Sequence, residues 1–241
     1  MRVSRIFTDQ QLSPASDIAL DEPVCRYISQ VLRIRVGQRF TLFDGSGSDF
    51  EAELTSCDRG GCSARVIAEM SREQPPPLQL HLGIGISRGE RMDFAIQKSV
   101  ELGVSAITPL FTTRSMVQLK TKRREKRLVH WQGIIRSACE QSGRSLLPQL
   151  HFPSSLPEWL SAHPGGLMLY HKSVDTLATS PPPGERLNLL VGPEGGLNET
   201  ERALAATNGF SGVRMGPRVL RTETAPIAAL AAIQVLWGDF R

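Results

Sequence analysis

The sequence predicts an α/β protein with a mostly parallel sheet, preceded by a small β-rich module. Short β-like runs fill the first 72 residues, whereas strand-like runs alternate with helical patterns after residue 77. Between them stands Glu73-Gln74-Pro75-Pro76-Pro77, and three consecutive prolines favour a stiff extended spacer over a helix or a central strand. We therefore divide the chain into a module at 1–72, a linker at 73–77 and an α/β domain at 78–241.

The N-terminal module is predicted from apolar and β-branched runs. Strands are expected at 36–43, 50–54 and 62–67, and residues 27–32 are typical of one or two helical turns. Asp44-Gly45-Ser46-Gly47 separates the first two strands and has the composition of a hairpin turn. These elements predict a small β-barrel.

The α/β domain is predicted from the alternation of short apolar runs with helical periodicity. A long helix at 122–141 would carry Leu128, Trp131, Ile135 and Ala138 on one face. The other expected elements are a strand at 78–84, a helix at 91–102 that stops at Gly103, strands at 105–111, 166–170 and 187–191, a helix after Asn198, a strand at 211–215 and a helix from Ala225.

Composition narrows the class of protein. With 40% hydrophobic and 22% charged residues, the chain is neither fibrous nor globally disordered. The net charge is +4 and the pI is about 9.1. The excess lies after residue 72, because the first 72 residues hold nine Arg, no Lys and ten Asp or Glu. This distribution is mild support for a polyanionic partner of the second domain.

The four cysteines form no CxxC pair, and no His stands at zinc-ligand spacing, so we expect no metal. Cys25, Cys57, Cys62 and Cys139 are expected to be reduced and mostly buried, as in a cytoplasmic protein. The longest apolar stretch, 225–237, is too short to span a bilayer, and no membrane association is expected.

Two loops near the C-terminus carry the strongest functional pattern. Val191-Gly-Pro-Glu-Gly-Gly196 ends a strand, and Asn198 with Glu201 has the spacing of a capping box for the next helix. Residues 216–225 follow the next strand, with Thr224 as the expected N-cap and Pro226 in the first turn. Each loop alone could be a tight turn or a capped helix. Together, at the carboxyl ends of neighbouring strands, they predict a ligand pocket.

Other catalytic patterns are weaker. Gly83-Ile-Gly85-Ile-Ser-Arg-Gly89 is close to a dinucleotide fingerprint, but its third glycine comes one residue too late. No P-loop, nucleophile elbow or Cys–His pair is present. His171 follows a strand and is expected beside the pocket. The remaining histidines are expected to be structural or exposed: His81, His130, His151 and His163.

A basic run at 120–127 has Lys or Arg at six of eight positions. It could be only the solvated start of a helix, but contact with phosphates is the favoured interpretation. N-terminal arginines could extend this surface, although salt bridges within an acidic module explain them almost as well. The expected RNA-binding residues are Arg2, Arg5, Arg33, Arg88, Arg114, Lys120, Lys122, Arg123, Arg124 and Arg144.

The chain resembles the SPOUT (α/β-knot) methyltransferases, and within them the ribosomal RNA small subunit methyltransferase E family, which methylates N3 of a uridine in 16S ribosomal RNA. The resemblance runs along nearly the whole chain in order. The matching segments are Val31-Leu-Arg33 with Val36-Gly37, Phe43-Asp-Gly-Ser-Gly47, Gln97-Lys98 with Glu101-Leu-Gly-Val104, Glu140-Gln-Ser-Gly-Arg144, Val191-Gly-Pro-Glu-Gly-Gly196, Met215-Gly-Pro-Arg-Val-Leu-Arg-Thr-Glu-Thr-Ala225 and Gly238-Asp239.

The resemblance implies an RNA-binding PUA-like β-barrel, a knotted C-terminal domain, a homodimer with each active site near the partner chain, and S-adenosylmethionine as cofactor. Ser87-Arg88 stands where the family often has a lysine, and Pro226 is a second departure. The implied cofactor-binding residues are Leu169, Tyr170, Val191, Gly192, Pro193, Glu194, Gly195, Gly196, Met215, Gly216, Leu220, Thr222 and Thr224.

Two catalytic side chains are hypothesised. Arg221 would stabilise negative charge developing on the uracil, and Glu223 would orient the pocket or accept the N3 proton. A salt bridge that only shapes the loop is the structural alternative, and a base from the partner chain or from the RNA is another. Two other functions remain open: a SPOUT enzyme acting on transfer RNA or 23S ribosomal RNA, and a non-catalytic RNA-binding ribosome-assembly factor.

Overall fold

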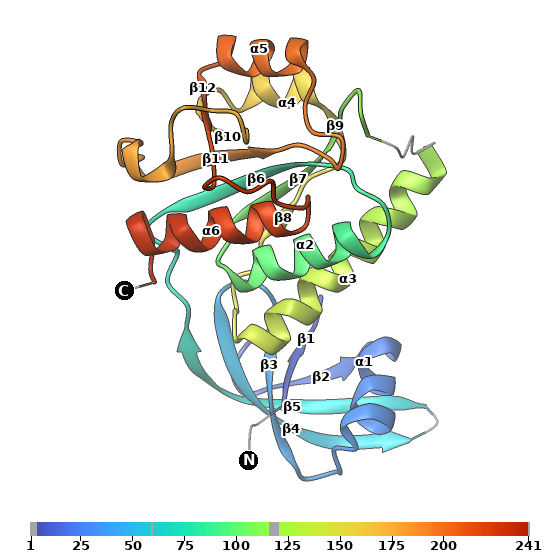
Figure 1. Ribbon diagram of the computed structural model, residues 1–241. Helices are drawn as coiled ribbons and strands as arrows, with labels where there is room; N and C mark the ends of the chain where they lie inside the picture. The colour runs from blue at the N-terminus through green and yellow to red at the C-terminus, as the bar shows by residue number, and fades with distance from the viewer. Residues whose placement is uncertain (1–3, 59, 116–120, 241) are drawn as a thin grey trace. The chain divides into compact units, whose positions relative to one another are not determined.

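The computed structural model describes residues 4–58, 60–115 and 121–240, with the side chains of 121–123 left out (Figure 1). The chain forms two compact units. Unit 1 comprises Met1–Pro75 and Cys139–Leu147, and unit 2 comprises Pro76–Ala138 and Pro148–Arg241. Unit 1 thus includes a short segment from far along the chain, which the sequence-based division placed in the second domain.

Unit 1 is built on a five-stranded sheet in the order β1-β3-β4-β5-β2. The predicted turn at 44–47 joins β3 to β4 as an antiparallel pair, and the Asp44 carboxylate accepts a hydrogen bond from Ser46 N at 3.0 Å. Phe40, Leu42 and Leu54 are fully buried in its core. Its elements are β1 (Arg5–Phe7), β2 (Ser16–Leu20), α1 (Glu22–Arg26), a π-helical turn (Tyr27–Leu32), β3 (Arg39–Phe43), β4 (Ser48–Asp58) and β5 (Gly61–Arg72).

The cysteines of this sheet differ from expectation. Cys57 and Cys62 lie directly opposite each other in the β4–β5 pair and form a disulfide, with 4.0 Å between their Cα atoms. The prediction that both thiols are reduced was wrong. It rested on the absence of CxxC spacing, whereas a β-hairpin also brings two cysteines five residues apart close enough to form a disulfide. Cys25 and Cys139 are free and buried, as predicted.

Unit 2 is built on a parallel sheet in the order β12-β10-β11-β6-β7-β8, with β9 pairing β7. In Figure 1, α2 and α6 lie side by side on one face, and α4 and α5 lie on the other. The mostly parallel α/β arrangement is confirmed. The strands are β6 (Gln79–Gly85), β7 (Ala106–Phe111), β8 (Gln149–Leu150), β9 (Ser154–Ser155), β10 (Gly166–Leu169), β11 (Arg186–Val191) and β12 (Phe210–Val213). The helices are α2 (Glu90–Glu101), α3 (Thr121–Ser142), α4 (Leu156–Ala162), a 3₁₀ turn (Leu177–Thr179), α5 (Glu199–Thr207) and α6 (Thr224–Trp237).

Helix starts show how the C-terminal loops are positioned. The predicted capping box of α5 is present, with Asn198 Oδ1 accepting from Glu201 N at 2.8 Å. The predicted N-cap of α6 was wrong. Glu223 takes that position without a side-chain cap bond, because Thr224 N already bonds to Arg221 O at 3.0 Å and the turn begins earlier. Pro226 lies in the first turn, as predicted.

Three histidines pack around Trp159 within unit 2. The ring centroids of His81 and His163 are 4.4 Å apart, and those of His81 and His151 are 5.1 Å apart. His81 Nε2 lies 2.8 Å from Thr108 Oγ1. Burial, with the neighbouring charges of His163 and His151, lowers the pKa of His81 to about 3. The structural role expected for these three histidines agrees with this packing.

The lowered pKa of His81 predicts acid sensitivity. Above its ordinary value of 6.5 the imidazole is neutral in both states, but as the pH falls toward 3 only the unfolded chain takes up the proton. The free energy of unfolding should therefore fall by about 1.4 kcal/mol per pH unit below 6.5 through this group alone. Urea denaturation of the wild type and His81→Gln between pH 7.5 and 5 checks this. We expect a shallower slope in His81→Gln than in the wild type. Equal slopes in the two proteins would contradict the assignment.

In the described part of the chain, no helix is both long and apolar enough to cross a membrane.

Candidate functional site

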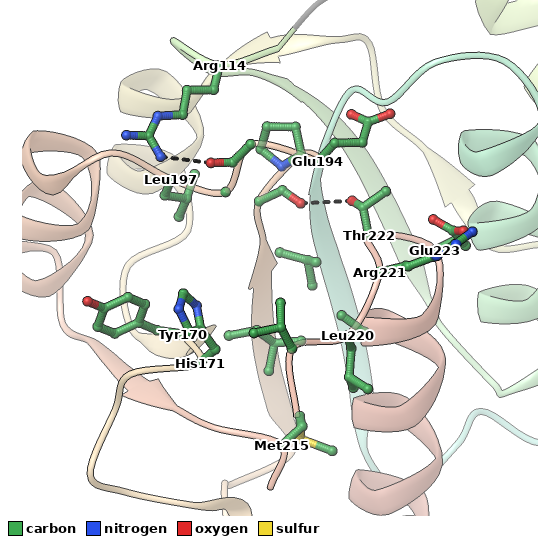
Figure 2. A pocket seen from close by; sticks show the side chains of 18 of the residues that line it. Arg114, Tyr170, His171, Glu194, Leu197, Met215, Leu220, Arg221, Thr222 and Glu223 are labelled. Carbon is green, nitrogen blue, oxygen red and sulfur yellow. Dashed lines mark hydrogen bonds between the residues drawn. The ribbon is translucent and has the colours of Figure 1, made fainter. Parts of the chain in front are cut away.

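A cavity of about 740 Å³ lies where β10, β11 and β12 end (Figure 2). These strands are neighbours in the parallel sheet, so their carboxyl ends open on the same side. The loops 169–172, 191–197 and 213–225 supply most of the lining. The volume falls in the range of small-molecule sites, and the position is the one where open α/β sheets bind ligands.

The glycine loop after β11 is packed tightly. Gly196 has φ +65°, and its N–H bonds to Pro193 O at 2.8 Å, which closes the turn. A Cβ on Gly192 would lie 3.0 Å from Leu197 N, and one on Gly85, at the end of β6, would lie 2.5 Å from Pro193 N. The glycines therefore allow two strand exits to meet backbone against backbone.

Hydrogen bonds tie three loops together at the cavity. Thr222 Oγ1 donates to Gly192 O at 3.1 Å, a bond that Figure 2 shows, and lies 3.3 Å from Ser87 Oγ. Arg88 N donates to Glu194 Oε1 at 3.1 Å. These bonds connect the loops that follow β6 and β11 with the loop before α6, and the three loops together form one wall of the cavity.

Gly85→Ala tests this wall. The new Cβ would overlap the Pro193 backbone, so the glycine loop must move, and we expect affinity for the ligand of the cavity to fall at least 10-fold. Calorimetry with S-adenosylmethionine measures it. Gly184→Ala is the matched control, because its Cβ would point into open space and no positive φ constrains it. Similar affinities in both variants would show that the packing of Gly85 does not control the pocket.

Two buried carboxylate oxygens at the cavity have no hydrogen-bond partner in the part of the chain that the structure describes. They are Oε2 of Glu194 and Oε2 of Glu223. Burial raises the pKa of Glu194, but hydrogen bonds from backbone N–H groups, including that of Arg88, and the charge of Arg91 outweigh it, so the pKa lies below its ordinary value. The site therefore holds an ionised carboxylate, and two buried carboxylate oxygens of its lining residues have no partner among the described residues.

Cationic side chains also line the cavity. Arg221 is exposed there, and among the described residues no ion pair joins it to Glu223, so the alternative of a salt bridge that shapes the loop gains no support. In Figure 2 both side chains lie on the side of the cavity opposite Tyr170 and His171. The lining residues that can carry a positive charge are Arg91, Arg114, His171, Lys172, Arg202, Arg218 and Arg221.

The structure brings together most of the residues expected at the pocket. Arg221 and Glu223 line the cavity, whereas Gly216 and Thr224 do not. His171 lies beside it, as expected. The expected cofactor-binding residues in the lining are Leu169, Tyr170, Val191, Gly192, Pro193, Glu194, Gly195, Gly196, Met215, Leu220 and Thr222. Lining residues that sequence reasoning did not assign to the pocket are Arg91, Arg114, Lys172, Leu197, Arg202 and Val213.

The expected RNA-binding residues are not all equivalent. Arg114 lines the cavity and donates from Nη1 to Gly195 O at 2.8 Å. Arg88 has an exposed side chain, and its backbone N–H bonds to Glu194, which lines the cavity. Arg124 stacks over the Phe111 ring at 4.5 Å. Arg33 is exposed on unit 1. Arg2 and Lys120, and the side chains of Lys122 and Arg123, lie outside the described residues.

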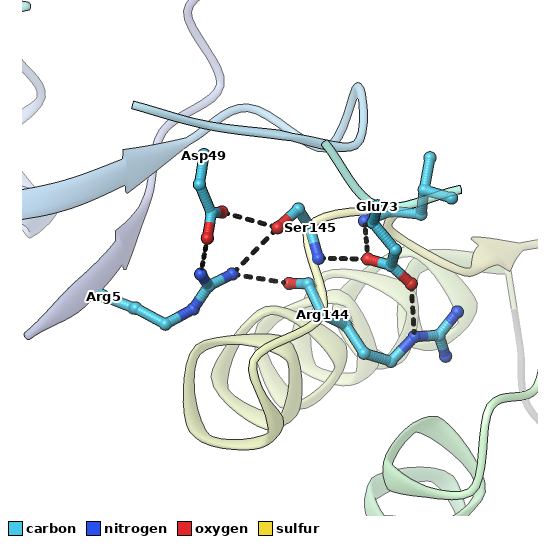
Figure 3. A network of polar contacts seen from close by, with 6 residues as sticks. Arg5, Asp49, Glu73, Arg144 and Ser145 are labelled. Atoms are coloured by element: carbon cyan, nitrogen blue, oxygen red, sulfur yellow. Dashed lines mark hydrogen bonds and ion pairs between the residues drawn. The ribbon is translucent and has the colours of Figure 1, made fainter. Parts of the chain in front are cut away.

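Arg5 and Arg144 lie inside unit 1, and Figure 3 shows them in one polar network. Their side chains are 14% and 13% exposed, and each pairs with a carboxylate, Asp49 and Glu73 respectively. Both guanidinium groups are thus already paired within unit 1, as the salt-bridge alternative anticipated for Arg5, although Arg5 Nε is buried without a hydrogen-bond partner among the described residues.

Within 4–58, 60–115 and 124–240, no group of three or more His, Cys, Asp or Glu side chains is arranged so that it could hold a metal ion.

Comparison with known proteins places the chain in a family. The profile of the RNA methyltransferase domain matches residues 74–234, and that of the RNA methyltransferase PUA domain matches 20–67. Ribosomal RNA small subunit methyltransferase E of Buchnera aphidicola (subsp. Schizaphis graminum) is 33% identical, over 99% of this chain and 98% of the relative. The enzyme of the same name from Bacillus subtilis is 30% identical, over 96% of each.

A solved structure of ribosomal RNA small subunit methyltransferase E from Neisseria gonorrhoeae, bound to S-adenosyl methionine, has 40% identity and a TM-score of 0.95, with both chains covered completely. A putative methyltransferase from Legionella pneumophila, in complex with the bound cofactor SAM, has 35% identity and the same TM-score and coverage. These matches agree with the resemblance inferred from the sequence motifs. The chain therefore belongs to the RNA methyltransferase family that includes the ribosomal RNA small subunit methyltransferases E.

Proposed function

We propose that this chain transfers a methyl group from S-adenosylmethionine to N3 of a specific uridine in 16S ribosomal RNA. One observation carries the proposal: the loops that end β10, β11 and β12, with β10 between the other two strands, enclose a cavity of about 740 Å³, in a chain that matches named ribosomal RNA small subunit methyltransferases over nearly its full length. No feature of the cavity favours a second reaction.

The residues present fit this cofactor. S-adenosylmethionine carries an ammonium and a sulfonium group, and the cavity is lined by two carboxylate side chains, Glu194 and Glu223, each of which has one oxygen without a partner among the described residues. The backbone of 192–196, with Tyr170 and Leu220, would enclose the rest of the molecule. When bound, the cofactor supplies an electrophilic methyl group.

The protein must handle the N3 proton, because uridine N3 is largely protonated at neutral pH. Glu223, which lines the cavity, would accept this proton and so leave N3 able to receive the methyl group that the cofactor would supply. Arg221 stabilises the negative charge that develops on the uracil oxygens. Because the reaction is an in-line displacement, holding the two reactants in place supplies much of the rate.

The RNA would reach the cavity across the exposed arginines Arg88 and Arg114, with Arg124 of α3, which lies over the Phe111 ring, as a further cation of unit 2. The division of the chain into an RNA-binding domain at 1–72, a linker at 73–77 and a methyltransferase domain at 78–241 is kept as part of the proposal. Within the RNA-binding domain, the exposed side chain of Arg33 would contact the RNA. Arg5 and Arg144 are left out, since their partners lie within unit 1. These contacts suit a phosphate backbone.

We further propose that the chain works as a homodimer in the cytoplasm. Exposed apolar side chains on neighbouring helices of unit 2 support a second copy as partner: Phe94 on α2 is 46% exposed, and Val235 and Leu236 on α6 are 59% and 44% exposed. Burial of these side chains against a second copy would remove apolar surface from water and so favour association. Sedimentation equilibrium checks this, and a monomer at micromolar concentration would contradict it.

Incubation of the purified protein with radiolabelled S-adenosylmethionine tests the reaction. We expect label in 16S ribosomal RNA, supplied either as 30S particles or as free RNA, at one uridine whose product comigrates with 3-methyluridine. Label in transfer RNA or 23S ribosomal RNA instead would assign another RNA substrate. Failure of folded protein to bind the cofactor in calorimetry would exclude methyl transfer and leave an RNA-binding protein.

A further inference from the structure

One cation of the cavity differs from the others in its surroundings. Arg202, in the first part of α5, is half-buried, whereas the other six lining residues able to carry a positive charge are exposed. An exposed cation remains hydrated and mobile at the rim of a site. A half-buried one is held in a fixed place and presents less hydrated N–H groups to whatever enters.

Two contacts fix the Arg202 guanidinium. It lies over the Tyr170 ring, 4.6 Å from the centroid, and Nη1 donates to Leu197 O at the end of the glycine loop. No carboxylate among the described residues pairs with it, so most of its N–H donors remain unused while it lines the cavity. A fixed, uncompensated guanidinium in a cavity is suited to bind a planar anion.

We infer that Arg202 binds the carboxylate of the bound methyl donor. The inference rests on the proposed function, which makes that donor S-adenosylmethionine. The donor has a single anionic group and two cationic ones. The lining of the cavity offers complementary charges, with the Arg202 guanidinium beside Tyr170 and the carboxylates of Glu194 and Glu223. A phosphate of the RNA would meet the exposed arginines at the rim before it met Arg202.

Calorimetry with two ligands tests this assignment. One is S-adenosylmethionine, and the other is its decarboxylated analogue, which lacks only the carboxylate. We expect the wild type to bind the first about 10- to 100-fold more tightly, as for loss of a charge-assisted hydrogen bond. The ratio of the two dissociation constants should fall to near one in Arg202→Ala and recover partly in Arg202→Lys. Arg186→Ala, an exposed arginine at the far end of β11, should keep the wild-type ratio.

The ratio separates this role from a structural one, even if the variant is less stable. If Arg202→Ala lowers the affinity for both ligands by the same factor, Arg202 only positions Tyr170 and the glycine loop, and the inference is overturned. If the ratio stays at the wild-type value while the salt dependence of RNA binding decreases, Arg202 binds a phosphate, and the inference is again overturned. In both cases the wild type still binds S-adenosylmethionine, so the proposed function stands. Absence of binding to the folded wild type would overturn both.

Discussion

Replacing Arg221 with Ala is expected to lower the rate of methyl transfer about 100- to 1000-fold while the affinity for S-adenosylmethionine changes by only a few-fold. The side chain lines the cavity, and no described carboxylate neutralises it. Its charge is therefore available to the uracil, whose oxygens become more negative as the N3 proton leaves. Once RNA covers the site, this interaction strengthens, because water no longer screens it. Single-turnover rates with saturating cofactor and 30S particles measure the effect.

Glu223→Gln removes only the ability to accept a proton and keeps the size of the side chain. We expect a comparable loss of rate at neutral pH, with recovery at alkaline pH where the uracil ionises by itself. The Arg221→Ala and Glu223→Gln effects should not add, since both residues act on the same ionisation. If either variant instead loses cofactor affinity in proportion to its rate, that residue shapes the cofactor loop, and its catalytic assignment is wrong.

The pocket could be predicted from the sequence because its parts are local. Strand-ending apolar runs, glycines and the Asn198–Glu201 capping box are each contained within a few residues, and their order along the chain already placed two loops at the same edge of a sheet. Short elements were missed for the opposite reason. β1 is only three residues long, and its partner β3 lies more than 30 residues further along the chain. Neither a turn nor a periodic pattern in the sequence therefore predicts this strand.

Long-range contacts were the other source of error. Arg202 stands one turn into a helix, where an arginine is ordinary, and only the fold brings its guanidinium over Tyr170. Likewise, nothing in the local pattern showed that 139–147 packs into unit 1 and gives Arg5 and Arg144 partners. The knotted threading of the chain came from the family resemblance and stays a prediction.

The network that surrounds Arg5 predicts the largest stability effect in the molecule (Figure 3). Asp49 pairs with Arg5 Nη1 and accepts from Ser145 Oγ at 2.5 Å, and Arg5 Nη2 donates to Arg144 O and Ser145 Oγ, each at 3.1 Å. Glu73 accepts from Ser145 N and Leu146 N, which holds the segment 139–147 against the sheet. The Arg5 and Asp49 side chains are only 14% and 11% exposed, so each depends on the other for compensation of its charge.

Asp49→Ala should therefore lower the free energy of unfolding of unit 1 by about 3–5 kcal/mol, because it leaves the Arg5 guanidinium buried without a counter-charge. The double variant Arg5→Met/Asp49→Leu should recover most of this loss, since the desolvation cost of both charges disappears together. Arg39→Ala, which breaks an exposed pair with Glu51, should cost less than about 1 kcal/mol and is the control. Denaturant unfolding of the full chain measures all three. If Arg5→Met left stability unchanged and weakened only RNA binding, the pair with Asp49 would be incidental and Arg5 would belong to the RNA surface after all.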